Sequence, residues 1–173
     1  KERIQRELHV AGNIQRLSLP SDFNYHPKLD IFAENLAHSS VGGDFFNILK
    51  TGDDELHFFI ADAAGKGVAA ALLITNIQAN LNALINIEAT YQQIIKQLHD
   101  VIGKLTNYEA FVTLFLGKID LKNNTLTYLN AGHNPPLLLR GKEWVELRDG
   151  CIPLGIMPID DFNVGEIAFE PGD

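Results

Sequence analysis

Residues 41–67 read VGGDFFNILKTGDDELHFFIADAAGKG, and this stretch decides the fold. Two apolar runs are separated by the turn formers at 51–54, which predicts a β-hairpin. Each run carries one aspartate where a strand is normally apolar: Asp44 follows two glycines, and Asp62 precedes a Gly-Lys-Gly segment. The hairpin would bring both carboxylates to the same region. Carboxylate oxygens suit a hard cation such as Mg²⁺ or Mn²⁺.

Each aspartate also has a structural interpretation. Asp62 could cap the helix that follows it, because a side-chain oxygen satisfies free N–H groups at a helix start. Asp44 could be a turn residue after the glycine pair. Because two glycine-flanked aspartates bracket one hairpin, the metal-site and structural interpretations both stay open at this point.

The composition narrows the class of protein. The 173 residues, 46% hydrophobic and 21% charged, suit one globular domain. The net charge of −8 argues against a nucleic-acid partner. Cys151 is the single cysteine, so no internal disulfide forms, which fits a reducing, cytoplasmic location. We expect no apolar run of membrane-spanning length and no direct membrane insertion by this segment. The chain starts at Lys1, so we expect it to belong to a longer protein.

The N-terminal stretch, residues 1–17, has apolar residues at near-helical spacing. Two interpretations are open: a helix that packs on its own domain, or the end of a connector from an upstream sensor or dimerisation domain. We therefore predict a connector or regulatory helix over 1–17 and a single domain over 18–173. A homodimer is possible.

The remaining periodicities predict strands, then two long helices, then strands. The helices are expected at 68–87 and 91–105, with Thr90 as N-cap of the second. Outside the hairpin, strands are expected at 29–38, 111–120, 125–130, 136–140, 144–147 and 162–169. This order predicts an α+β fold with helices layered on antiparallel sheets.

The segment NAGHNPP at 130–136 predicts an irregular loop directly after a strand. His133 within it has two interpretations. It could be a general acid or a phosphate contact, since histidine titrates near neutral pH. It could instead form a hydrogen bond that ties the loop to the adjoining sheet, and this interpretation is favoured.

Six segments in order resemble the successive motifs of the bacterial metal-dependent protein phosphatases of the PPM (PP2C-like) class, RsbU/SpoIIE type. They are VGGDFF, IADAAGKGVAAALL, FVTLFLGKID, TLTYLNAGHNPPLLL, CIPLGI and FEPGD. The resemblance runs from about Ile14 to Asp173. It implies an α-β-β-α sandwich of two antiparallel sheets flanked by helices, incomplete at the C-terminus.

The resemblance also implies the chemistry. Such proteins remove phosphate from phosphoserine or phosphothreonine on a regulatory protein, typically an anti-sigma-factor antagonist, with two Mn²⁺ or Mg²⁺ ions and an activated water. By this resemblance Asp62 bridges the two metals, Asp44 binds metal directly or through water, and the backbone carbonyl of Ala63 is a ligand. The catalytic residues would be Asp44 and Asp62.

Two departures from the family pattern matter. Ala64 stands where many relatives have serine. The later Asp-Gly ligand motif is expected beyond Asp173, and Asp149-Gly150 lacks the surroundings to replace it. We therefore expect the 173 residues alone to have little or no activity and to leave a sheet edge unpaired. The alternative is a non-catalytic phosphatase-like module that binds a partner or receives a signal.

Overall fold

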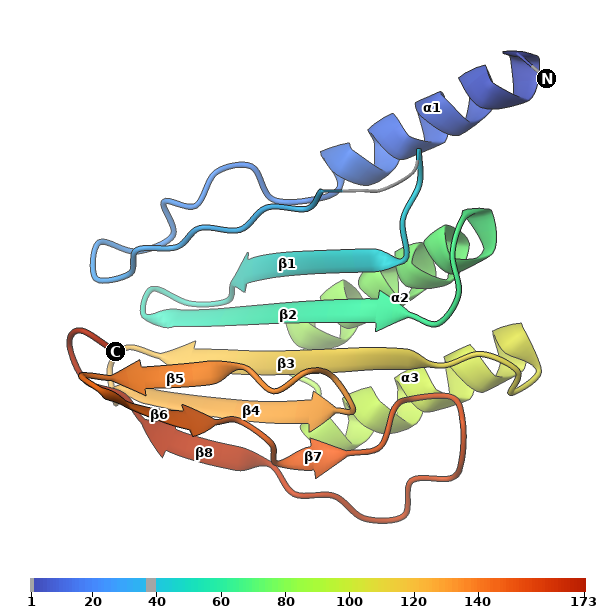
Figure 1. Ribbon diagram of the computed structural model, residues 1–173. Coiled ribbons are helices and arrows are strands. Elements are labelled where there is room, and N and C mark those ends of the chain that lie inside the picture. The colour runs from blue at the N-terminus through green and yellow to red at the C-terminus, as the bar shows by residue number, and fades with distance from the viewer. Residues whose placement is uncertain (1, 37–39) are drawn as a thin grey trace.

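The computed structural model describes residues 2–36 and 40–173, arranged around one six-stranded sheet (Figure 1). The helices are α1 (Glu2–Leu17), α2 (Val68–Asn86) and α3 (Tyr91–Thr106). The strands are β1 (Asp44–Lys50), β2 (Glu55–Ala63), β3 (Val112–Asp120), β4 (Thr125–Ala131), β5 (Leu137–Arg140), β6 (Glu143–Glu146), β7 (Gly150–Cys151) and β8 (Gly165–Ala168).

The sheet has the strand order β1-β2-β3-β4-β7, and β8 also pairs with β4. All pairs are antiparallel except β4 with β7, which is parallel. The expected hairpin is confirmed: β1 and β2 pair along their length, from Asp44 opposite Asp62 to Lys50 opposite Leu56.

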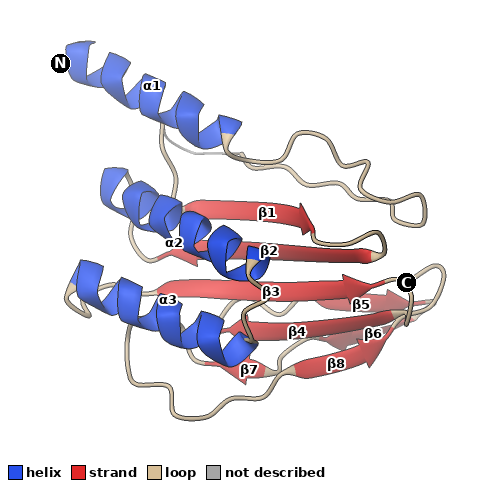
Figure 2. Ribbon diagram, turned by 180° about the vertical axis from the view of Figure 1, so that it is seen from behind, coloured by secondary structure: helices blue, strands red, loops and turns tan. Residues whose placement is uncertain are grey.

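Helices α2 and α3 cover one face of this sheet (Figure 2). The alternating strand residues Phe59 and Leu116 point into the core that these helices close, together with Ile77 of α2 and Leu98 of α3. The predicted cap of α3 is confirmed, because the Thr90 side chain accepts a hydrogen bond from a backbone N–H in a reciprocal capping box.

By length and composition alone, α2 is apolar enough to cross a membrane, which differs from the expectation of no such run. Its side chains Ile74, Ile77 and Leu81 are almost fully buried in the core. Part of the apolar character of α2 is therefore accounted for by its packing against the sheet.

The opposite face of the sheet is only partly covered. The two-stranded sheet β5–β6 lies over the β3–β4 side (Figure 1), where Phe115 and Tyr128 stack with ring centroids 5.7 Å apart and Leu147 is buried beside them. The β1–β2 side of this face has no second sheet over it; Phe23 stacks on Phe46, and residues 31–34 border a cavity there.

Three expectations about strands need correction. Residues 29–36 form no strand, and 37–38 of the predicted 29–38 lie outside the described residues. A strand needs a neighbour for its backbone groups, and among the described strands none pairs with this segment. Strand β7 was not expected: at Gly150 a Cβ would lie 1.9 Å from the carbonyl oxygen of Asn130, so only glycine permits this pairing. The last strand, β8, is shorter than predicted.

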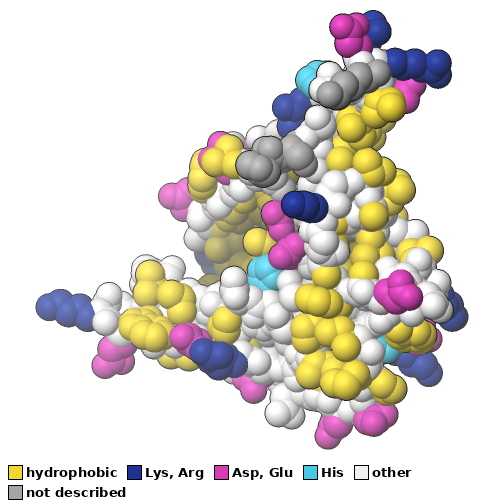
Figure 3. All heavy atoms as spheres, turned by 45° about the vertical axis from the view of Figure 1, so that its right-hand side comes forward, with side chains coloured by type: hydrophobic (Ala, Val, Ile, Leu, Met, Phe, Trp, Pro, Cys, Tyr) yellow, Lys and Arg dark blue, Asp and Glu magenta, His cyan; other side chains and the backbone are white. Residues whose placement is uncertain are grey.

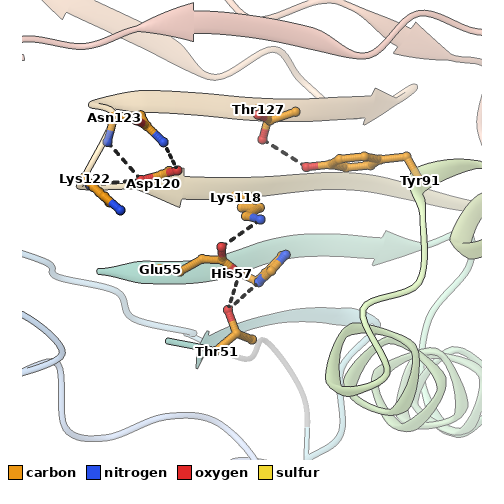
Figure 4. A network of polar contacts seen from close by, with 9 residues as sticks. All are labelled: Thr51, Glu55, His57, Tyr91, Lys118, Asp120, Lys122, Asn123 and Thr127. Atoms are coloured by element: carbon orange, nitrogen blue, oxygen red, sulfur yellow. Dashed lines mark hydrogen bonds and ion pairs between the residues drawn. The ribbon is translucent and has the colours of Figure 1, made fainter. Parts of the chain in front are cut away.

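Polar side chains occupy the end of the sheet that is remote from Asp44 and Asp62 (Figure 4). Lys118 lies 2.8 Å from Glu55, and Thr51 contacts both Glu55 at 3.0 Å and His57 at 3.1 Å. Burial and the charge of Lys118 lower the pKa of His57. These contacts satisfy one another, so this end has a structural role.

Candidate metal centre

The β1–β2 register brings Asp44 and Asp62 together. The two residues lie directly opposite each other, and Asp62 is in turn opposite Thr113 of β3. Their chain neighbours Phe45 and Ala61 are buried on the helix-covered face, so the aspartates point to the open face, because successive residues alternate. The result is a polar row across three adjacent strands.

The structural interpretations of the two aspartates are wrong. Asp62 does not cap α2, because the N-cap is Gly67 and no side chain caps this helix. Asp44 is the first residue of β1 and lies outside any turn. Both carboxylates are therefore free of these local roles.

The backbone at Gly43 lies close to Ala63 and Ala70, next to the polar row. Gly43 has little room for a side chain: a Cβ would lie 3.1 Å from the carbonyl oxygen of Ala63 and 3.1 Å from the Cβ of Ala70. The N–H of Ala63 donates to the carbonyl of Gly43 at 3.0 Å. The start of β1 is thus held against Ala63, whose carbonyl remains a predicted metal ligand.

The electrostatics of the pair favour a cation. Partial desolvation in the fold, followed by the charge of Asp44, raises the pKa of Asp62. In the described part of the chain, neither carboxylate has an ion-pair partner. Two adjacent carboxylates without a counter-charge form an all-oxygen donor set, which fits Mg²⁺ or Mn²⁺.

The donor set is small. Across residues 2–36 and 40–173 there is no cluster of three or more His, Cys, Asp or Glu side chains able to hold a metal. Asp149 has a structural role, because its carboxylate accepts a hydrogen bond from the hydroxyl of Tyr128 at 2.8 Å. The expectation that Asp149 does not complete the site therefore agrees with its contacts.

His133 lies at the end of the polar row. Its Nδ1 is 2.8 Å from the hydroxyl oxygen of Thr113, and its backbone N–H donates to Asn130 Oδ1 at 2.8 Å. Burial lowers the pKa of His133, and the charge of Asp44 opposes this. The favoured interpretation, a hydrogen bond from the loop to the sheet, is confirmed. The same bond also fixes the ring beside the two aspartates, which the sequence did not predict.

A cavity of about 610 Å³ adjoins His133 on the open face. Figure 3 shows this hollow, with acidic and histidine side chains at its edge. Its walls are mostly apolar and include Phe32, Phe46, Phe58, Ile60 and Phe115. The aromatic residues within 41–67 could have indicated an apolar surface. The position of this surface beside the aspartates follows only from the sheet register.

We expect a divalent cation to stabilise this protein in a pH-dependent way. Because the pKa of Asp62 is raised in the fold, the metal-free protein loses this contribution to stability as pH rises through the raised value. Mn²⁺ binds the deprotonated pair, so it reverses the loss at neutral pH. At Mn²⁺ about 100-fold above Kd, stability should rise by about 2.7 kcal/mol, or roughly 5–10 °C in Tm.

Thermal unfolding between pH 4 and 7.5, with MnCl₂ and with EDTA, measures this effect. The gap between the two curves should widen with pH. An Asp62→Asn variant is the control and should show almost no gap. An equal gap at both ends of the pH range would contradict the assignment of the carboxylates.

Known proteins resemble this chain in sequence. The model of the family "Stage II sporulation protein E (SpoIIE)" matches residues 52–173. The chain is 26% identical over 175 residues to phosphoserine phosphatase RsbU of Bacillus subtilis, covering 100% of this chain and 52% of RsbU. It is 27% identical over 202 residues to protein IcfG of Synechocystis sp., covering 100% of this chain and 32% of IcfG. The chain thus spans about half or less of these relatives.

Solved structures establish the fold class. The SiaA-PP2C domain of Pseudomonas aeruginosa matches with a TM-score of 0.77 at 22% identity, covering 99% of this chain and 69% of that one. RsbX in complex with magnesium matches with a TM-score of 0.65 at 20% identity, covering 80% and 66%. The predicted α+β, PP2C-like fold, a β-sheet with flanking helices, is confirmed.

Proposed function

Because the chain belongs to the SpoIIE family, we propose that it is the phosphatase part of a longer signalling protein. It hydrolyses phosphoserine or phosphothreonine on a regulatory protein, of the anti-sigma-factor-antagonist kind. The observation that carries the proposal is the direct pairing of Asp44 with Asp62 on the open face of the sheet. The relative RsbU, whose name is phosphoserine phosphatase, supports the same activity.

The residues of the polar row would have separate roles in metal binding and phosphate binding. Asp44, Asp62 and the carbonyl of Ala63 would hold two Mn²⁺ or Mg²⁺ ions, Asp62 binding both. Such ions lower the pKa of a bound water and offset the charge of phosphoryl oxygens. With Nδ1 of His133 engaged by Thr113, Nε2 is the ring nitrogen available to a phosphate oxygen. The hydrogen bond keeps the ring from rotating away, which preorganises this contact.

The exposed apolar residues of α1 bear on how this domain is connected to the rest of the protein. α1 leaves Val10, Ile14 and Leu17 exposed. These apolar side chains support the proposal that α1 continues into an upstream sensor or dimerisation domain, with a homodimer as one arrangement. The proposal includes a cytoplasmic location, from the single cysteine. It also includes no nucleic-acid partner, because the net charge is −8.

Metal-dependent turnover by the full-length protein tests the function. We expect hydrolysis of p-nitrophenyl phosphate and of a phosphoserine peptide with MnCl₂ or MgCl₂, a loss of at least about 10²-fold in EDTA, and recovery when the metal is restored. A phosphotyrosine peptide serves as a specificity control. Full activity in chelator would refute the proposal.

The alternative, a non-catalytic module that binds a partner, has one observation in its favour. The described residues hold no cluster of three metal-binding side chains. Should the full-length protein bind a phosphorylated partner without releasing phosphate at any metal concentration, the alternative replaces the phosphatase.

A further inference from the structure

The C-terminal half of α1 is joined to the backbone that leads into Asp44. Gln15 Nε2 donates to the carbonyl oxygen of Gly42 at 2.8 Å, and the Gly42 N–H donates to Gln15 Oε1 at 2.9 Å. The side-chain amide of Gln15 supplies both a donor and an acceptor to the same residue. Gln15 therefore fixes both the position and the orientation of the Gly42 peptide groups.

The same face of α1 makes two more close contacts. At Gly12 a Cβ would lie 1.8 Å from the carbonyl oxygen of Ser40, so the helix can approach this backbone only without a side chain. Gln78 of α2 donates to the carbonyl of Ser18 at 2.9 Å and accepts from the Ser18 hydroxyl at 3.2 Å. Gly12 and Gln15 are three apart and share one face of α1, and Ser18 directly follows the end of the helix. α1 is thus held in one place through small and polar residues.

Asp44 depends on this support because of where it lies. β1 is the last strand in the sheet order, so β2 is its partner on one side only. Asp44 is its first residue, and the two residues before it are glycines, whose backbone is the least restricted. Strand ends of this kind open most readily. Gln15 holds the first of these glycines through its two hydrogen bonds to Gly42.

We propose that Gln15 is a positioning residue for Asp44: through Gly42 it sets where this carboxylate lies relative to Asp62. The inference rests on the proposed function, since it concerns the same metal-binding pair.

A direct measurement of Mn²⁺ affinity in the full-length protein tests this inference. Gln15→Glu keeps the size and the acceptor but removes the donor to the Gly42 carbonyl. Gln5→Glu is the matched control, because it adds the same charge to an exposed position of the same helix. Titrations followed by the EPR signal of free Mn²⁺ give Kd, and amide hydrogen exchange reports on residues 42–44.

We expect Gln15→Glu to weaken Mn²⁺ binding about 10-fold, as loss of a partner that orients a metal ligand typically does. Exchange at 42–44 should accelerate, Tm should move by less than about 3 °C, and saturating Mn²⁺ should restore most of kcat. Gln5→Glu should match the wild type. Equal Kd values for the two variants would overturn the inference. A wild type that binds Mn²⁺ without hydrolysing phosphomonoesters would overturn only the proposed function, and one that binds no Mn²⁺ would overturn both.

Discussion

Asp62→Asn in the full-length protein should lower metal-dependent kcat/KM by roughly 10³-fold or more. Asparagine has the same shape as aspartate but no charge. The variant therefore keeps one anionic ligand, Asp44, where the wild type has two adjacent carboxylates. The fold should survive, because the side chain is exposed at the sheet rim and the raised pKa of Asp62 marks repulsion that the substitution removes. Phosphate release over a range of MnCl₂ concentrations measures the loss.

The matched control for this prediction is Asp53→Asn. Asp53 is an exposed aspartate at the opposite end of the same hairpin, in the connection between β1 and β2. Its variant should retain the activity of the wild type, and circular dichroism should show both variants folded. An Asp62→Asn protein with more than about one tenth of wild-type activity would exclude Asp62 as a metal ligand.

Leu98→Ala should destabilise the protein by about 2–5 kcal/mol, which corresponds to a fall of roughly 5–15 °C in Tm. Leu98 is fully buried, at 0% exposure, where α3 packs on the sheet. The truncation removes apolar contacts and leaves a cavity, because a close-packed core relaxes only in part. Urea or thermal unfolding by circular dichroism measures the effect.

Leu105→Ala tests the same chemistry on the same helix without burial. Leu105 is 57% exposed, so its truncation should cost less than about 0.5 kcal/mol. If the two variants unfolded at the same temperature, the packing of α3 on the sheet would be wrong. Such a result would also contradict the description of α3 as part of the layer that packs against β2, the strand that carries Asp62.

The hairpin and its two aspartates could be predicted because their signals are local. Turn formers at 51–54 between two apolar runs predict the hairpin, and a hairpin brings Asp44 and Asp62 to the same region, where the structure pairs them. The helices were predictable for the same reason, with Thr90 marking the start of α3. These features need no knowledge of distant segments.

The rest depended on contacts between distant segments. The contact of His133 with Thr113 crosses from a loop to another strand, and the contact of Gln15 with Gly42 spans 27 residues. Neither follows from spacing. Residues 29–36 have the composition of a strand, but a strand exists only where a neighbour accepts its hydrogen bonds, and the pattern of one segment does not contain that neighbour.

The residue-by-residue alignment of β1 with β2 limits which insertions and deletions the gene can accumulate. Removing one residue from within either strand would rotate its aspartate onto the face packed by α2 and α3, because side-chain direction alternates at every position. The connection between the strands, by contrast, can lengthen without moving either carboxylate. Length variation among descendants of this sequence should therefore concentrate at 51–54 and spare 44–50 and 55–63.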